Sequence, residues 1–574
     1  MPSAMEPQSV DALIVGAGFG GIYQTKKLVD QGFNVKAIDM AEDVGGTWYW
    51  NHYPGAMSDT QSVLYRYSWD IEDLKTYPWA NHYLQGAEIL AYLRHVVEKY
   101  DLRKHFQFKT ELLSAKWNED ERRWFVTLST NEVFKVKYLV TGLGLLSKTN
   151  FPKIHNLDKF QGELYHTARW PENVSLKGKR VGVIGNGSTG VQLITAIAKA
   201  DEVKQLLSFQ RNPQYSVPAG NGPVSASHRK HLNDTYEEIW DQAKNSLFAY
   251  GFEETKRPTF SVTPTERQEI FEDAWEKGNG FRFMFWTFGD ITTDEDANKE
   301  AADFIRNKIR QTVKDPEKAR KLCPTEFYAR RPLCDTGYYE QFNRDNVDIV
   351  DIKSDPITEL TPEGIKTSDG KIYELDVLIC ATGFDAVDGS YTQIAIEGRN
   401  GETLKDHWSA TGPTSYLGIS VPNFPNLFMI TGPNGPFSNL PPAIECHVEI
   451  ISDLIATAEK KSPKLIKAAD VVDGINGKTL TNGHGANGVN GHKTNGMPVN
   501  DIIEAEPQAE QYWTDLCDEM SSKSLFRRIE SSWIFGANVA GKKTTSMFFF
   551  GGLGPYMKAV RSILDDDLKG FKRS

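Results

Sequence analysis

The stretch DALIVGAGFGG, residues 11–21, decides the fold of this chain of 574 residues. Residues 11–16 are a short apolar run that ends in glycine, which predicts a buried strand. A helical pattern follows as far as Gly32, and residues 34–39 predict a second strand. A strand, a helix and a second strand in this order form the unit that begins many dinucleotide-binding domains.

The glycines of this stretch follow the spacing G-x-G-x-x-G. Gly16 permits the tight turn, Gly18 lets the backbone approach a pyrophosphate, and Gly21 lets the helix pack closely on the strand. The pyrophosphate then lies at the positive N-terminus of the helix. Asp39 ends the second strand, where a carboxylate accepts hydrogen bonds from ribose hydroxyls. A purely structural glycine turn is the alternative, but strand, helix and acid together favour a dinucleotide site.

The same pattern recurs over residues 179–211, where KRVGVIG, STGVQLITAIAKA and VKQLLSFQR predict a strand, a helix and a second strand. The glycines of the second motif are Gly185, Gly187 and Gly190. Its second strand ends in Arg211 instead of an acid. An Asp there would repel a 2′-phosphate, whereas an Arg pairs with it. This site is therefore predicted to prefer NADPH, the alternative being that Arg211 is a solvated charge.

The two strand ends predict different occupants for the two sites. A nucleotide without a 2′-phosphate suits the first site, and FAD fits best. The segment GGTWYWNHYPG, residues 45–55, follows directly, and its glycines allow close backbone approach while its Trp and Tyr offer flat faces. FAD and NADPH in one chain predict hydride transfer from the nicotinamide to the flavin.

Composition excludes several other classes. A formal net charge of −11 argues against a nucleic-acid-binding protein. The five cysteines are widely spaced without a C-x-x-C, which argues against structural zinc, or any metal site, and against disulfide reductases. No apolar run approaches the roughly 20 residues that span a bilayer, and the N-terminal residues do not resemble a signal peptide. We therefore expect a cytoplasmic protein without a membrane partner; its oligomeric state follows from none of these patterns.

The predicted fold class is α/β, with two Rossmann-like dinucleotide-binding domains, for FAD and for NADP, and a helical insertion. Helical spacing in residues 234–252 and 298–322 marks this insertion. Residues 474–498 hold five Asn-Gly dipeptides and almost no apolar side chain, so we expect a mobile surface loop. His484 and His492 in it are weak metal-ligand candidates. The expected boundaries are 1–145 (FAD domain, first part), 146–223 (NADPH domain, first part), 224–329 (insertion), 330–385 (NADPH domain, second part) and 386–574 (FAD domain, second part).

A third motif, FQGELYHTARWP at residues 160–171, precedes the second glycine motif. It matches F-x-G-x-x-x-H-x-x-x-W-P, the fingerprint of type I Baeyer–Villiger monooxygenases. Further segments resemble this family in order, especially its cyclohexanone monooxygenase branch, among them GGTWYWNHYPGAMSDT, GFRFMFWTFGDI, RPLCDTGYYE, ATGFDAVDG, GPNGPFSNLPP and SWIFGAN. The likeness extends from about residue 10 to 570, apart from the Asn-Gly loop. It implies an enzyme that uses NADPH and O2 to convert ketones to esters or lactones through a C4a-peroxyflavin. Cyclic ketones of small or medium size are the expected substrates, and sulfides are expected to be oxidised as well.

A catalyst for this reaction needs a fixed positive charge, because an oxyanion develops on the ketone. Arg330 and Arg331 are both candidates from chemistry alone, the alternative being an ordinary ion pair. The resemblance assigns catalysis to Arg331 and orientation of this Arg to Asp59, which could otherwise be a loop cap. It assigns NADPH contact to Arg330, where the family commonly has Lys.

The resemblance also supplies the remaining site residues. We expect His166 in a linker between domains, with a conformational or NADPH-positioning role. Trp533 resembles a Trp on a loop that closes over NADP. The expected FAD-binding residues are Gly16, Gly18, Phe19, Gly21, Asp39, Gly46, Thr47, Trp48, Tyr53, Asp59 and Tyr65. The expected NADPH-binding residues are Gly185, Gly187, Ser188, Thr189, Gly190, Gln192, Arg211, Arg330 and Trp533. The fingerprint residues are Phe160, Gly162, His166, Trp170 and Pro171, and the expected substrate-pocket residues are Leu146, Phe437, Ser438, Asn439 and Leu440.

A flavin monooxygenase that hydroxylates nitrogen or sulfur is the nearest alternative. Such enzymes share both nucleotide sites, but they do not carry this fingerprint together with the Arg of RRPLCD. A flavoprotein that senses NADPH without catalysis is a more distant one.

Overall fold

The computed structural model describes residues 6–459, 501–539 and 541–574. The Asn-Gly-rich segment 474–498, with His484 and His492, lies outside the described residues. Among the described helices, none is long and apolar enough to cross a membrane.

The first sheet has the strand order β19-β4-β5-β6-β1-β2-β3, with β20 joined to β6. Strands β3, β2, β1, β6 and β20 are parallel, whereas β4, β5 and β6 form an antiparallel meander. Its strands are β1 (Gln8–Val15), β2 (Val35–Ile38), β3 (Phe106–Gln107), β4 (Leu112–Asn118), β5 (Arg123–Leu128), β6 (Val133–Thr141), β19 (Ala395–Glu397) and β20 (Leu427–Met429).

The second sheet is wholly parallel, with the order β13-β10-β9-β17-β8. Its central strands are buried, as expected for a parallel sheet covered on both faces. The strands are β8 (Glu163–His166), β9 (Arg180–Ile184), β10 (Gln205–Gln210), β13 (Val347–Asp351) and β17 (Val377–Cys380). Beside it lies an antiparallel sheet of β14 (Ile357–Thr361), β15 (Gly364–Thr367) and β16 (Ile372–Glu374).

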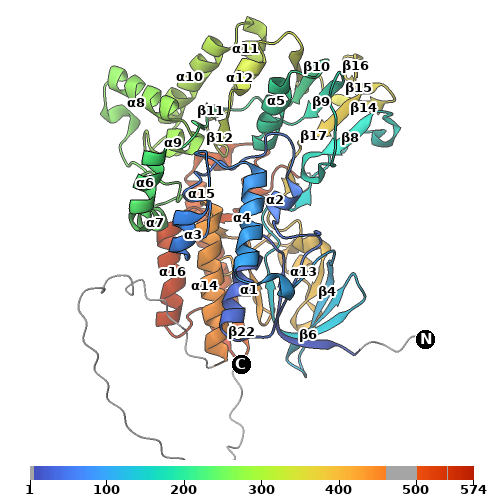
Figure 1. Cartoon of the computed structure of the whole chain (residues 1–574), viewed down its shortest axis with the longest axis vertical. Coiled ribbons are helices and arrows are strands. Elements are labelled where there is room, and N and C mark those ends of the chain that lie inside the picture. Colours follow the sequence, from blue (N-terminus) through green and yellow to red (C-terminus); the bar gives the residue numbers. More distant parts are fainter. Residues whose placement is uncertain (1–5, 460–500, 540) are drawn as a thin grey trace, which may run out of the picture.

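Helices cover the two sheets separately. Figure 1 shows the second sheet with α5 in the upper half of the molecule, and the first sheet with α1, α14 and α16 in the lower half. The helices outside the insertion are α1 (Phe19–Asp30), α2 (Thr47–Trp50), α3 (Ile71–Thr76), α4 (Gly86–Lys99), α5 (Ser188–Ala200), α12 (Tyr338–Gln341), α13 (Leu404–Ser409), α14 (Leu440–Ala458), α15 (Pro507–Ser522) and α16 (Leu553–Asp565). Both predicted βαβ units are present, so the α/β fold class is confirmed.

A group of helices, green in Figure 1, follows the second βαβ unit in the chain. They are α6 (Ala226–Asp234), α7 (Tyr236–Asn245), α8 (Pro264–Lys277), α9 (Gly280–Phe285), α10 (Glu295–Thr312) and α11 (Pro316–Leu322). The predicted helix over residues 234–252 was too long, because α7 ends at Asn245. Ala249 and Gly251 have φ values of 58° and 78°, which a right-handed helix cannot contain.

The C-terminal part of the chain contributes to both halves. Helix α14 packs on α1 beside the first sheet. In contrast, the aromatic side chains of Phe526, Phe535 and Phe548 belong to the core of the second sheet and the inserted helices. Short strand pairs join distant segments: β11 (Ser216–Pro218) with β12 (Leu333–Asp335), β7 (Lys148–Thr149) with β18 (Phe384–Asp385), β21 (Gly435–Pro436) with β23 (Phe548–Phe549), and β22 (Ile503–Ala505) with β24 (Phe571–Arg573).

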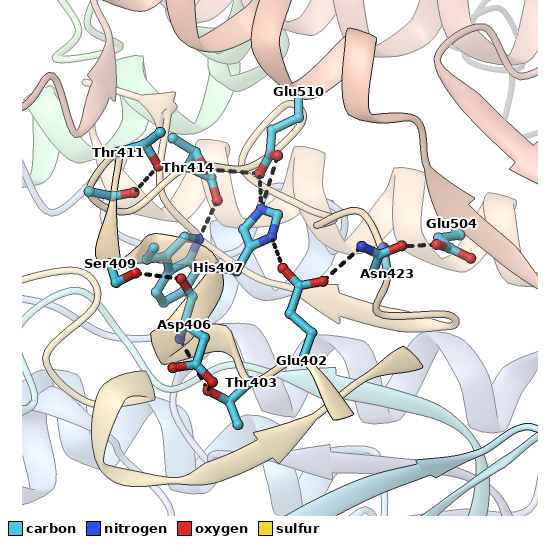
Figure 2. A network of polar contacts seen from close by, with 12 residues as sticks. Glu402, Thr403, Asp406, His407, Ser409, Thr411, Thr414, Asn423, Glu504 and Glu510 are labelled. Atoms are coloured by element: carbon cyan, nitrogen blue, oxygen red, sulfur yellow. Dashed lines mark hydrogen bonds and ion pairs between the residues drawn. The ribbon is translucent and has the colours of Figure 1, made fainter. Parts of the chain in front are cut away.

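A network of polar side chains ties α13 to α15 at the edge of the first sheet. Figure 2 shows the His407 ring between two carboxylates. Its Nδ1 lies 2.9 Å from Glu402, and its Nε2 lies 3.0 Å from Glu510. Glu510 also accepts from the Thr414 hydroxyl at 2.9 Å. Burial alone would lower the pKa of His407, but the two carboxylates outweigh burial and raise it, so this ring is held as a cation at the edge of the sheet.

Candidate functional site

The first glycine loop is shaped by close backbone contacts. Gly16 has a φ of 113°, and a Cβ there would lie 2.3 Å from the carbonyl oxygen of Gly142. A Cβ on Gly21 would lie 1.8 Å from the Gly16 oxygen. The Asp39 carboxylate accepts from the Ala17 N–H at 2.6 Å, so the acid is fixed to the glycine turn itself.

The second loop repeats this construction. Gly185 has a φ of 105°, with the Ala381 oxygen 2.4 Å from a built Cβ, and a Cβ on Gly190 would lie 2.2 Å from the Gly185 oxygen. Gly187 differs, because a Cβ there would meet nothing within 4 Å. The N-caps of α1 and α5 are Gly18 and Gly187, and neither has a side chain that caps the helix. Both helices therefore offer free N–H groups of the kind that hold a pyrophosphate.

An ion pair connects the two halves. The Arg331 guanidinium lies 2.7 Å from Oδ2 of Asp59 and donates to the Ser188 hydroxyl at 2.9 Å. Ser188 is the first residue of α5, so the Arg contacts the second glycine loop directly. Burial alone would lower the pKa of Arg331, but Asp59 outweighs burial and raises it. Arg331 is thus a permanent cation held between the two halves.

Two polar features, one in this pair and one at the glycine loops, fit bound cofactors. The Asp59 side chain is buried, and its Oδ1 has no hydrogen-bond partner among the described residues. A buried carboxylate oxygen without a partner is costly, so a hydroxyl or amide of a ligand would satisfy it. The two uncapped helix N-termini fit the pyrophosphates of FAD and NADPH in the same way.

Aromatic side chains surround the ion pair. The Arg331 guanidinium lies 5.2 Å from the centre of the Phe281 ring, and the Phe281 and Tyr250 rings stack at 4.0 Å. Burial raises the pKa of Tyr65 to about 12, and its hydroxyl accepts from the Trp48 indole at 3.3 Å. The cation is therefore flanked mainly by aromatic side chains, while 27% of the Arg331 side chain remains exposed.

The segment at residues 45–55 is joined to the second half through a glutamine. The Tyr53 hydroxyl donates to the Gln192 side chain at 2.8 Å, and Gln192 donates to the Met57 carbonyl at 3.1 Å. Gln192 lies on α5. Of the FAD-site residues, Phe19 packs against Tyr65, and Gly46 opens α2, which begins at Thr47.

The arginines assigned to NADPH lie in different surroundings. Arg211 follows the last residue of β10 and is exposed, which fits both a contact with a ligand and the alternative of a solvated charge. Arg330 instead pairs with Glu326 at 2.6 Å and donates to the Glu530 carbonyl. Its charge already has a partner within the protein. Thr189 lies beside Ser188 in the first turn of α5.

The fingerprint residues do not form one cluster. His166 is the last residue of β8, so the expectation that it lies in a linker was wrong. The strand is short and its first three side chains are only half buried, which hides it from sequence patterns. Burial lowers the pKa of His166 to about 4, and its Nδ1 accepts from the Ala168 N–H. Trp170 is buried and packs near Tyr165, Pro171 is exposed, and the Phe160 ring packs over Gly162.

The expected substrate-pocket residues lie at the junction of the two halves. Phe437 contacts the Phe248, Phe548 and Phe550 rings. Asn439 is held in place, because it donates to the Ala249 carbonyl and accepts from the Thr60 hydroxyl. Trp533 begins a short 3-10 helix and meets Phe548 edge to face. Leu146 is half buried and packs against the core of the second sheet and the inserted helices. Ser438 donates to the Asn439 carbonyl, and Leu440 is the first residue of α14.

Sequence reasoning missed two side chains of this site. Tyr250 and Phe281 come from the inserted segment, where many aromatic residues occur without a distinguishing pattern. Phe281 lies in GFRFMFWTFGDI, a segment that resembles the family but carries no chemical motif of its own. Their place beside Arg331 depends on how the insertion folds back on the two glycine loops, and no local pattern encodes that.

Two nucleotide-type glycine loops, the second of which contacts an Arg–Asp ion pair through Ser188, define a flavin- and nicotinamide-dependent oxidoreductase. Residues 10–214 match the family model described as flavin-binding monooxygenase-like. The crystal structure of cyclohexanone monooxygenase from Rhodococcus sp. Phi1 bound to NADP+ superposes with a TM-score of 0.91 at 50% identity, covering 99% of this chain and 100% of that chain.

Two relatives are equally similar in sequence. Cyclohexanone 1,2-monooxygenase of Acinetobacter sp. and phenazine N-monooxygenase of Lysobacter antibioticus are each 47% identical over 98% of this chain and 96% of theirs. The chain belongs to the Baeyer–Villiger monooxygenase family. It is a flavoprotein enzyme that depends on NADPH and carries FAD.

Proposed function

We propose that this enzyme oxidises cyclic ketones of small or medium size to lactones, inserting one oxygen atom of O2 beside the carbonyl. The observation that carries this proposal is the Arg331–Asp59 ion pair, in which a buried carboxylate holds a guanidinium against Ser188 of the second glycine loop. Relatives of this size and similarity that act on cyclohexanone support it.

FAD is assigned to the first loop and NADPH to the second. The fixed Asp39 and the uncapped α1 support FAD at the first, with Phe19, Gly46, Thr47, Trp48, Tyr53 and Tyr65 near it. The exposed Arg211 and the open space at Gly187 support NADPH at the second, together with Ser188, Thr189 and Gln192. Arg330 is proposed only as a peripheral contact, because Glu326 already pairs with it.

Reduced flavin, when bound, supplies the activated oxygen, and the chain's own residues set the charge around it. An oxyanion develops on the ketone oxygen as the new carbon–oxygen bond forms. Arg331 provides a permanent positive charge for this oxygen, and a charge acts more strongly the more water the bound cofactors and ketone displace from it. Asp59 orients the guanidinium with Oδ2 and leaves Oδ1 for a cofactor group.

The apolar rim favours uncharged substrates. Leu146, Phe437 and Leu440 are proposed to enclose the ketone, with Ser438 and Asn439 at its edge. A dry site also limits the loss of activated oxygen as hydrogen peroxide. His166, which burial keeps neutral, is proposed to position the fingerprint segment rather than to transfer protons.

Oxidation of an aromatic ring nitrogen is the second candidate function, because a phenazine N-monooxygenase is as similar as a cyclohexanone monooxygenase. The two reactions need opposite character in the activated oxygen: nucleophilic toward a ketone and electrophilic toward nitrogen. Sulfide oxidation is expected in either case and does not distinguish them.

A substrate panel with product analysis tests the proposal. The purified enzyme is given NADPH, O2 and either cyclic ketones, linear ketones or phenazine, and products are identified by gas or liquid chromatography with mass detection. Lactone from cyclohexanone, at a rate well above phenazine N-oxidation, is the expected result. N-oxide formation without lactone from any ketone would replace the proposal by its alternative.

The cellular location and the domain boundaries are also proposals. The five cysteines are free, which supports a reducing compartment and so the cytoplasm. We keep the domain boundaries of the sequence analysis as a proposal, with the two sheets as the FAD and NADPH units.

A further inference from the structure

Arg169 occupies a variable position of the fingerprint, FQGELYHTARWP, and differs from its neighbours in exposure. Residues 166–168 and Trp170 are buried, whereas Arg169 is exposed. His166 fixes the local backbone by accepting from the Ala168 N–H. The Arg169 side chain therefore projects from a firmly held segment at the end of β8.

This side chain reaches the first half of the molecule. Its guanidinium lies 4.0 Å from the centre of the Trp50 ring, on the last residue of α2. It also interacts electrostatically with Asp39. Asp39 accepts a hydrogen bond from the Ala17 N–H of the first glycine loop. The same loop lies close to α2, because a Cβ on Gly18 would lie 3.4 Å from Gly46, which precedes α2. Arg169 thus lies beside the first glycine loop, although its strand belongs to the second sheet.

The guanidinium has few protein partners. One Nη donates to the Ala168 carbonyl at 3.0 Å. Among the described residues, no carboxylate oxygen lies within 4.0 Å of it as an ion pair. A cation that is positioned by an aromatic face and makes no direct ion pair fits an anionic ligand with a flat base.

The strand end that carries Arg211 is too distant to account for this cation. Arg211 follows β10, which is separated from β8 by β9 and β17. At about 4.8 Å per strand, three strand spacings place these two ends roughly 14 Å apart. A 2′-phosphate held by Arg211 would therefore not reach Arg169.

We propose that Arg169 binds the adenosine diphosphate half of FAD, together with Trp50, and that the fingerprint segment is in this way part of the flavin site. The segment then spans both halves: β8 lies in the second sheet, while Arg169 holds the cofactor of the first. The inference rests on the flavin site of the proposed function and not on the identity of the oxidised substrate.

Titration of the FAD-free enzyme with FAD, followed by flavin fluorescence, tests the inference without any ketone. Arg169→Met removes the charge and keeps the length, Arg169→Lys keeps the charge without the planar fork, and Arg320→Met is the matched control. Arg320 is an exposed Arg paired with Glu317 on α11, which lies beside the end of β10 in the second sheet. The circular dichroism of each FAD-free variant checks folding.

The Kd for FAD is expected to rise about tenfold or more in Arg169→Met, which corresponds to about 1.4 kcal/mol. Arg169→Lys should recover part of the affinity, the Arg320 control should match the parent enzyme, and the KM for NADPH should change less than about twofold. The dependence of the Kd on salt should also weaken in Arg169→Met, because a charge pair is lost.

An unchanged Kd for FAD in Arg169→Met would overturn the inference. Equal loss in the Met and Lys variants with the parent's salt dependence would also overturn it, since it would indicate a structural role. If the Met variant does not fold, Arg169→Gln, which also removes the charge, is titrated in its place and judged by the same outcomes. Failure of the enzyme to oxidise ketones would contradict the proposed function and leave the FAD titration untouched.

Discussion

The two glycine loops have the same backbone design and different chemistry. In both, the first glycine has a positive φ and the last glycine lies against the oxygen of the first, so neither tolerates a Cβ. In both, the following helix begins without a side-chain cap. The loops differ at the strand end: Asp39 bonds back to its own loop, whereas Arg211 is exposed. The shared features are thus requirements of the fold, and we propose that cofactor choice depends on the side chain at each strand end.

The loops also differ in their surroundings. Gly18 lies against Gly46 of the neighbouring segment, while Gly187 faces open space. The first loop is enclosed by its own half, as suits a cofactor that stays bound. The second is open, as suits NADPH, which must bind and leave in each cycle. Arg331 is the side chain that both halves share, through Asp59 and Ser188.

Removal of this shared side chain should have the largest effect. Arg331→Ala is expected to lower lactone formation by about a thousandfold or more, the cost of losing a preorganised charge at a developing oxyanion. Stopped-flow measurement of flavin reduction by NADPH should show a loss of less than about tenfold. Lactone formation within tenfold of the parent enzyme would remove Arg331 from its proposed role.

Substitution of single glycines should separate effects on folding stability from effects on NADPH binding. Gly21→Ala and Gly190→Ala force a Cβ onto a backbone oxygen, so each should destabilise the protein by about 3 kcal/mol. Gly187→Ala should leave the melting temperature unchanged and raise the KM for NADPH. Thermal unfolding and steady-state kinetics check both statements. A Gly187→Ala variant with unchanged KM would mean that NADPH does not approach this loop.

Arg211→Ala tests whether the side chains at the two strand ends bind different nucleotides. Loss of a charge-assisted contact with the 2′-phosphate costs about 1.5–3 kcal/mol, so kcat/KM for NADPH should fall roughly tenfold to a hundredfold. NADH serves as the internal control, because it lacks the phosphate, and its kcat/KM should change little. Equal losses with both nucleotides would contradict the assignment.

The smallest effect concerns His407, which belongs only to the first half. Its pKa is raised in the folded protein, so its stabilisation is fully present below the unfolded pKa of about 6.5 and is lost as the pH rises through the folded value. The melting temperature should therefore fall more steeply between pH 6.5 and 8.5 in the parent than in His407→Gln. The difference in stability at pH 6.5 should be about 1 kcal/mol.

The exposed His52, substituted by Gln, is the matched control and should follow the parent curve. If the stability gap between parent and His407→Gln instead widened as the pH rises, His407 would not be held as a cation.

Features encoded within one short segment could be predicted from the sequence, whereas contacts between segments far apart in the chain could not. Gly16, Asp39, Gly185 and Arg211 lie within two short segments whose patterns fix both structure and chemistry. The neighbours Arg330 and Arg331 carry identical chemistry, and only the fold shows that one meets Glu326 and the other Asp59. Resemblance to the family chose between them, where composition and spacing left the choice open.

Errors of prediction have the same physical origin. The strand that ends at His166 is a short edge strand, whose half-buried side chains do not alternate clearly. The helix predicted to reach residue 252 stops at Asn245, although the hydrophobic pattern continues, because the backbone becomes extended at Ser246 and left-handed at Ala249. Tyr250 then approaches Arg331 from this turn, and no periodic pattern reports such a contact.

Isotopically labelled O2 tests the central claim most directly. The enzyme is supplied with NADPH, cyclohexanone and labelled O2, and the lactone is analysed by mass spectrometry while NADPH consumption is followed. The account predicts one labelled oxygen atom in each lactone and one NADPH consumed per lactone formed. Consumption of NADPH with hydrogen peroxide as the product, and no labelled lactone, would contradict it.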